Sequence, residues 1–164
     1  MVSNTNKVGF GGGCHWCTEA VFQGLQGVAK VEQGYIASID DHSNFSEGVI
    51  VHYNPSQIPL HVLIEIHLHT HHSTKMHSRR TMYRSAIYVY NEELCSQANE
   101  SLRVLQADFE EPLITQVLPL ERFKSSRETL LNYYNTDPER PFCKRYIHPK
   151  LQMLQKEFSK YLNT

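Results

Sequence analysis

The chain has 164 residues, of which 40% are hydrophobic and 20% charged, and its net charge is −1. This composition is that of a globular protein with one sizeable core, and the near-neutral charge excludes the basic surface that nucleic acids and anionic membranes attract. No apolar run is long enough to cross a bilayer, and the polar start lacks the regions of a signal peptide, so we expect a cytoplasmic protein in which 1–164 form a single domain.

The apolar pattern predicts strands and helices that alternate along the chain. It predicts a strand at 7–10, a helix at 16–26 that Gly27 stops, a strand at 28–36, a polar turn at 38–44 and a strand at 48–53. A buried helix at 60–69, a strand at 85–90, a helix from Asn91 to Leu105 and a strand at 114–120 follow. A helical turn at 130–134 and a helix at 149–161 complete the chain. This order predicts an α+β fold, a two-layer sandwich with a ferredoxin-like split βαβ core and helices on one face of the sheet.

Cys14 lies where the first strand runs through three glycines into the first predicted helix. The free N–H groups and the dipole at a helix N-terminus stabilise an anion, and they lower the pKa of a thiol placed there. Glycines on the approach leave the sulfur accessible to a substrate. The position therefore predicts a nucleophile, and a buried structural cysteine after a glycine turn is the alternative.

The four cysteines are too sparse for a disulfide scaffold, which favours redox, catalytic or metal-binding roles. Cys14 and Cys17 form a C-x-x-C at a helix start, a spacing typical of dithiol exchange. Cys143 follows Pro141-Phe142 in a predicted loop, where a thiol can swing toward a partner. Cys95 lies inside a predicted helix, and we expect it to serve packing alone.

The segment around Cys14 resembles the GCFW-x-x-E-x-x-F signature of the A-type peptide methionine sulfoxide reductases. In this chain it reads Gly-Cys14-His-Trp16-Cys-Thr-Glu19-Ala-Val-Phe22. Further segments resemble that family in the same order along the chain. They are VEQGYI at 31–36, EGVIVHYNP at 47–55, YRSAIY at 83–88, PFC at 141–143 and IHPK at 147–150.

The resemblance implies reduction of the S epimer of free or peptide-bound methionine sulfoxide, with no cofactor. Cys14 would attack the sulfoxide sulfur and become a sulfenic acid, which a second thiol converts to a disulfide that thioredoxin reduces. The Glu47 carboxyl, held neutral beside the apolar run that follows it, would protonate the departing oxygen, and the Tyr83 hydroxyl would bind it. A solvated glutamate and a core or interface tyrosine are the alternatives. A monomer is expected.

The chain departs from the family pattern near the nucleophile. His15 stands where the family has phenylalanine. In that family an apolar wall receives the methyl group of the substrate, and of this wall only Trp16 is matched here. His15 would alter that wall or hold the Cys14 thiolate as an ion pair. Tyr35 is a substitute for a family tyrosine that has no clear match, or else a core residue. The family's GND-x-G-x-Q is replaced by HSRRTM at 77–82, so that Ser78 stands where its aspartate would be.

Two thiols are candidates to resolve the sulfenic acid. A disulfide between Cys14 and Cys17 would require the helical turn to loosen, because S–S geometry fits a regular α-turn poorly. Cys143 requires the C-terminal segment to fold back over the glycines, as the family pattern suggests. We favour Cys143, with Cys17 passing the disulfide onward or serving in its place.

Two functions of other classes stay open. The histidine-rich tract from His67 to His77 could bind a metal ion, although surface histidines at a helix end are the simpler interpretation. The C-x-x-C could serve a thiol-disulfide oxidoreductase without sulfoxide chemistry. Metal analysis of the purified protein tests the metal-binding function. Glu47 distinguishes sulfoxide reduction from plain disulfide exchange, because disulfide exchange needs no neutral acid at that position.

Overall fold

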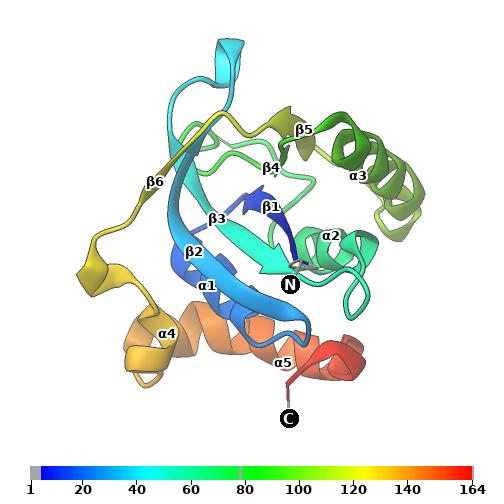
Figure 1. Ribbon diagram of the computed structural model, residues 1–164. Coiled ribbons are helices and arrows are strands. Elements are labelled where there is room, and N and C mark those ends of the chain that lie inside the picture. The colour runs from blue at the N-terminus through cyan, green and yellow to red at the C-terminus, as the bar shows by residue number, and fades with distance from the viewer. Residues whose placement is uncertain (1–4, 78, 164) are drawn as a thin grey trace.

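The computed structural model describes residues 5–77 and 79–163, which are arranged around one twisted sheet (Figure 1). Its strands are β1 (Asn6–Gly11), β2 (Val28–Ala37), β3 (Ser46–Tyr53), β4 (Ala86–Val89), β5 (Gln116–Pro119) and β6 (Arg122–Ser125). They follow the order β5-β4-β1-β3-β2-β6, in which β4 and β5 are parallel and the other neighbours antiparallel. The central order β4-β1-β3-β2 is the split βαβ arrangement, so the predicted fold class is confirmed.

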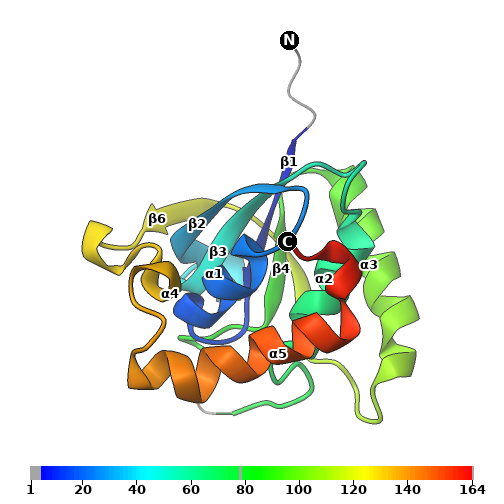
Figure 2. The same ribbon diagram turned by 90° about the horizontal axis from the view of Figure 1, so that it is seen from below.

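The helices gather on one face of this sheet, and Figure 2 shows α1 in front of the strands with α5 running below α1 and α2. They are α1 (His15–Gln23), α2 (Leu60–His69), α3 (Glu92–Leu105), α4 (Tyr133–Thr136) and α5 (His148–Glu157). A π-helical segment, Cys143–Ile147, leads into α5. No helix in the described part of the chain is long and apolar enough to cross a membrane.

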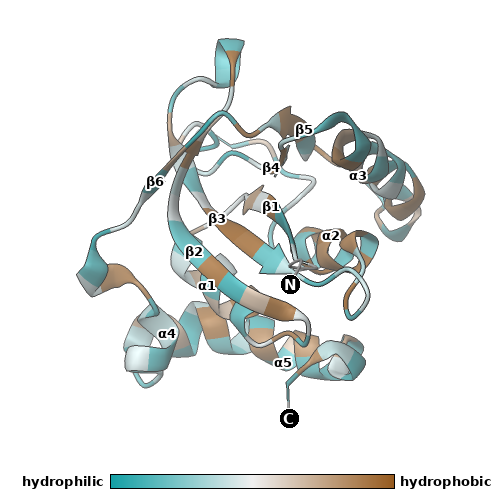
Figure 3. Ribbon diagram, in the orientation of Figure 1, coloured by the Kyte–Doolittle hydropathy of each residue, from teal (hydrophilic) through white to brown (hydrophobic). Residues whose placement is uncertain are grey.

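The main core lies between the sheet and the helices. In Figure 3 the apolar colour covers much of β3 and α2, whose buried residues meet in this core. The Phe10 ring on β1 stacks on the Phe22 ring on α1, with centroids 4.8 Å apart. Helix α2 is apolar around most of its circumference, which is expected of a helix enclosed in a core.

Several elements differ from their predictions, among them the last helix, which ends at Glu157 and not at Tyr161. Helix α1 ends at Gln23 because the next residues pair with the C-terminal segment, where Gln26 N–H donates to the Tyr161 carbonyl at 2.7 Å. Strand β6 was not predicted, because only Phe123 interrupts its polar sequence. Cys143 lies in a π-helical segment and is fully buried, so its predicted loop position is wrong. The predicted cap of α3 is confirmed, since the Asn91 side chain accepts from Leu94 N–H at 2.8 Å.

Candidate active site

A glycine loop joins β1 to α1 and places Cys14 at the first turn of the helix. Gly12 has a φ of +149°, and a Cβ atom there would lie 2.5 Å from the His71 ring, so only glycine fits. The Cys14 carbonyl accepts hydrogen bonds from Cys17 N–H at 3.1 Å and Thr18 N–H at 3.2 Å, which begin α1. The predicted location of Cys14 at a helix N-terminus is therefore confirmed.

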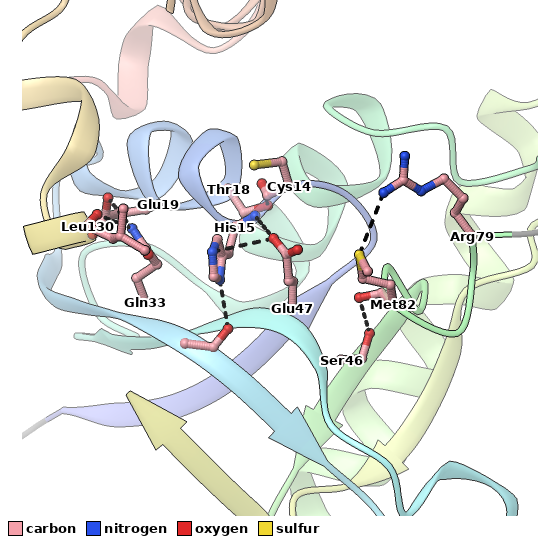
Figure 4. A network of polar contacts seen from close by, with 11 residues as sticks. Cys14, His15, Thr18, Glu19, Gln33, Ser46, Glu47, Arg79, Met82 and Leu130 are labelled. Carbon is pink, nitrogen blue, oxygen red and sulfur yellow. Dashed lines mark hydrogen bonds and ion pairs between the residues drawn. The ribbon is translucent and has the colours of Figure 1, made fainter. Parts of the chain in front are cut away.

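The Cys14 thiol is hydrogen-bonded to Cys17, one turn along α1. Figure 4 shows the Cys14 sulfur pointing away from the Glu47 carboxyl. The hydrogen bond to Cys17 and burial raise the pKa of Cys14, although the Trp16 N–H favours the thiolate. The same hydrogen bond, together with the charge of Lys150, lowers the pKa of Cys17. In this arrangement the pKa of Cys14 is therefore raised, whereas its position at the helix N-terminus predicted a lowered pKa.

Lys150 of α5 reaches a small cavity beside the two thiols. The cavity, of about 40 Å³, is lined by Gly13, Cys14, Cys17, Thr18, Val21, His67, Thr70, His71 and Lys150. The Lys150 ammonium donates to the Thr70 carbonyl, and burial lowers the pKa of this lysine. An ammonium this close to two thiols stabilises a thiolate on either of them.

Glu47, near the start of β3, brings its carboxyl to the N-terminus of α1. Its Oε1 accepts from His15 N–H at 3.2 Å and lies 3.4 Å from His15 Nε2, and the side chain is only 14% exposed. The half-buried Tyr83 lies beside Glu47, and burial followed by the charge of Glu47 raises the pKa of the Tyr83 hydroxyl. The two residues expected to handle the sulfoxide oxygen therefore lie together.

His15 is buried and directed toward the sheet. Its Nδ1 donates to the Gly34 carbonyl at 2.9 Å, while Nε2 faces Glu47. The predicted ion pair between His15 and the Cys14 thiolate is therefore wrong, because both ring nitrogens have other partners. Tyr35 lies directly opposite Glu47 across the β2–β3 pair, and its ring meets the His15 ring edge-on at 5.2 Å. Tyr35 thus lines the predicted site.

Trp16 forms an aromatic cluster with the C-terminal segment. Its ring stacks on Tyr133 with centroids 4.1 Å apart, and Phe142 meets it edge-on at 5.3 Å. The buried Glu19 carboxylate fixes this segment by accepting from Tyr133 N–H at 3.1 Å and Asn132 N–H at 2.9 Å. The sequence alone did not point to Tyr133 or to this role of Glu19. The available signal was the place of Glu19 in the signature around Cys14.

Cys143 lies against the other two site cysteines. It packs with the buried residues Cys17, Ala20 and Ile147, and Cys14 contacts this cluster. Burial raises the pKa of Cys143, and its thiol donates to the Asp137 carbonyl at 3.6 Å. The fold therefore brings Cys14, Cys17 and Cys143 together at one end of α1, whereas Cys95 lies apart on α3.

The histidine tract supports the glycine loop. His67 Nε2 donates to the Gly11 carbonyl at 2.8 Å, and His71 Nε2 pairs with Ser85 Oγ at 2.8 Å. The prediction of surface histidines is wrong for His67, which α2 buries under the loop, and His71, which follows α2, is half-buried there. Within 5–77 and 79–163 no group of three or more histidine, cysteine or acidic residues could hold a metal ion. Ser78 lies outside the described residues.

We expect His67 to make the fold sensitive to acid. Burial lowers the pKa of His67 to about 3, against roughly 6.5 in an unfolded chain. The unfolded state therefore binds a proton as the pH falls through roughly 6.5, while the folded state does not, so acid favours unfolding. From there down to a pH of about 3, the free energy of unfolding should fall by about 1.4 kcal/mol per pH unit for this group.

Urea unfolding at a series of pH values measures this effect. His67→Gln keeps a donor for the Gly11 carbonyl and should flatten the slope, while His71, whose pKa burial also lowers, maintains the rest of it. His61→Gln, on the exposed side of α2, is the matched control. Parallel curves for His67→Gln and the unchanged chain would contradict the expectation.

Comparisons with known proteins agree with this arrangement. Residues 6–162 match the family described as "Peptide methionine sulfoxide reductase". The peptide methionine sulfoxide reductase MsrA of Acinetobacter baumannii (strain AYE) is 31% identical, over 91% of this chain and 94% of the relative. Reduced Mxr1 from Saccharomyces cerevisiae aligns with a TM-score of 0.74 at 19% identity, over 82% of this chain and 87% of that one. Mxr1 in complex with Trx2 aligns with a TM-score of 0.63 at 19% identity, over 76% and 82%.

The family match covers nearly the whole chain, and the resemblance expected from the motifs is confirmed. The reduction of methionine sulfoxide is an oxidoreductase reaction, which the thiols, the carboxyl and the tyrosine around α1 can serve. This chain belongs to the peptide methionine sulfoxide reductase family.

Proposed function

We propose that residues 1–164 work as a single domain that reduces the S epimer of free and peptide-bound methionine sulfoxide. The observation that carries the proposal is the position of the Glu47 carboxyl, which accepts from His15 N–H at 3.2 Å at the start of the helix that follows Cys14, with Tyr83 beside it. Relatives named MsrA support the choice of epimer, because A-type and B-type reductases each act on one. Reduction of only the S epimer of a dabsylated methionine sulfoxide tests it.

The first step makes Cys14 a nucleophile. The Cys14 thiol gives up its proton to solvent, and the thiolate that remains is the nucleophile. Cys14 thiolate remains within reach of the Lys150 ammonium and of the Trp16 N–H. Its side chain then turns from Cys17 toward Glu47, a rotation about one side-chain bond.

The second step transfers the oxygen. The Cys14 thiolate attacks the sulfoxide sulfur while Glu47 and Tyr83 hold the oxygen, and Glu47 supplies the proton that it needs. The bond from methionine sulfur to oxygen breaks and a bond from Cys14 sulfur to oxygen forms. Methionine leaves reduced by two electrons, and Cys14, oxidised by two, becomes a sulfenic acid.

The third step returns Cys14 to the thiol. The Cys17 thiol attacks the sulfenic sulfur, which releases water and forms a Cys14–Cys17 disulfide. The Cys143 thiolate then attacks the Cys17 sulfur, so that the disulfide moves to Cys17–Cys143 and Cys14 is released. The packing supports this order, since Cys17 lies one turn from Cys14 and shares a buried cluster with Cys143. We propose thioredoxin as the dithiol that reduces the final disulfide, as the solved complex of Mxr1 with Trx2 suggests by analogy.

Removing either resolving thiol is expected to stop turnover with thioredoxin and spare the oxygen transfer. Cys17→Ser and Cys143→Ser should each release one equivalent of methionine, because Cys14 alone attacks the sulfoxide. Cys143→Ser should accumulate the Cys14–Cys17 disulfide, and Cys17→Ser should not, as peptide mapping by mass spectrometry can establish. Cys95→Ser is the control. Full thioredoxin turnover in either variant would remove that cysteine from the relay.

A further inference from the structure

Arg80 lies buried behind the glycine loop, and its guanidinium hydrogen-bonds to several backbone segments at once. Four carbonyl oxygens accept its hydrogen bonds. Nε donates to Lys75 O at 3.0 Å, Nη1 to Gly12 O at 2.7 Å and Tyr83 O at 3.0 Å, and Nη2 to His72 O at 2.5 Å. One side chain therefore connects the loop that precedes Cys14, the turn after α2 and the segment that carries Tyr83.

No carboxylate balances this charge. Within the described ranges Arg80 forms no ion pair, and burial lowers the pKa of its guanidinium. Taking a charge out of water costs free energy, which here only hydrogen bonds to carbonyl dipoles offset. A buried arginine used in this way fixes backbone positions, because its planar donor groups constrain every accepting oxygen at once.

The two carbonyls on Nη1 matter most for the reaction. Gly12 lies two residues before Cys14, and Tyr83 lies beside Glu47. The distance between the nucleophile and the groups that bind the sulfoxide oxygen thus depends on how these two segments are joined.

We propose that Arg80 is a positioning residue for the reduction, which holds the Gly12 and Tyr83 carbonyls together and so keeps Cys14 in reach of a sulfoxide whose oxygen Tyr83 and Glu47 bind. This inference rests on the proposed function. A displacement of roughly 1 Å at a reacting centre costs about 10²-fold in rate. Arg80→Lys keeps the charge but replaces the planar fork by a compact ammonium, which cannot span the four oxygens.

The test separates positioning from thiol reactivity. In Arg80→Gln and Arg80→Lys, the rate constant for single-turnover methionine release should fall about 10- to 100-fold. The rate constant for alkylation of Cys14 by iodoacetamide, followed by peptide mapping, should change by less than about threefold, because alkylation needs only the thiolate. Millimolar guanidinium should restore part of the release rate in Arg80→Gly, because it refills the vacated position.

Arg103→Gln, on the exposed face of α3, is the matched control. If Arg80→Gln does not fold, Arg80→Lys, which retains the charge and the aliphatic stem, decides the question. Release within about threefold of the unchanged chain in a folded variant overturns the inference, and so does a parallel loss of release and alkylation. Failure of the proposed function gives a different result, since the unchanged chain would then release no methionine.

Discussion

Cys14→Ser is expected to abolish the release of methionine from methionine sulfoxide while leaving the fold intact. A hydroxyl is too weak a nucleophile to attack the sulfoxide sulfur, because it ionises far less readily than a thiol. Cys14 occupies the N-cap of α1, a position that serine favours, so the helix should not weaken. Chromatography of the methionine released in a single turnover measures the loss of activity, and thermal unfolding measures whether the fold is intact.

Cys95→Ser is the matched control, because Cys95 lies on α3 away from the other three thiols. It should release methionine at the rate of the unchanged chain. If Cys14→Ser still releases methionine, Cys17, with its lowered pKa, becomes the nucleophile and the proposed order of steps fails.

Glu47→Gln is expected to lower turnover by about 10²- to 10⁴-fold, the usual loss when a general acid is removed. The amide has the shape of the carboxyl, so it can accept from His15 N–H and donate to the sulfoxide oxygen. It cannot release a proton to that oxygen, which is the step the reaction requires. Steady-state turnover with dithiothreitol as reductant measures the effect.

Glu110→Gln, an exposed loop substitution, serves as the control for this change. Near-normal turnover in Glu47→Gln would show that the proton comes from another group, and the adjacent Tyr83 is the next candidate. A loss confined to KM would instead indicate that Glu47 binds the substrate without protonating it.

The sequence predicts the core of the fold well, because its central strands and α2 are strongly periodic. The split βαβ order follows from the apolar runs at β1, β3 and β4. Each of these runs can be buried only within the sheet and beneath the helices. Strand β6 lacks such a run, since Arg122 and Lys124 are exposed and only pairing with β2 makes it a strand. The end of α1 likewise depends on a C-terminal segment more than a hundred residues away.

The site could be predicted only where a local motif carries it. Cys14 follows from the glycines and the helix start, and the resemblance suggested Glu47 and Tyr83, which the structure places in contact. The partners of His15 could not be predicted, because they depend on the register of β2 and β3. Arg80 and Lys150 reach the site from distant segments, and no local pattern indicates which carbonyls or thiols they would meet.

The most direct test is reduction of separated S and R epimers of dabsylated methionine sulfoxide, with dithiothreitol as reductant. The account predicts that the unchanged chain converts the S epimer to dabsyl-methionine, leaves the R epimer intact, and loses this activity in Cys14→Ser. The assay should be run beside reduction of a small disulfide, because the hydrogen-bonded C-x-x-C would suit a plain thiol-disulfide oxidoreductase. Disulfide reduction without conversion of either epimer, or conversion of the R epimer in preference to the S, would contradict it.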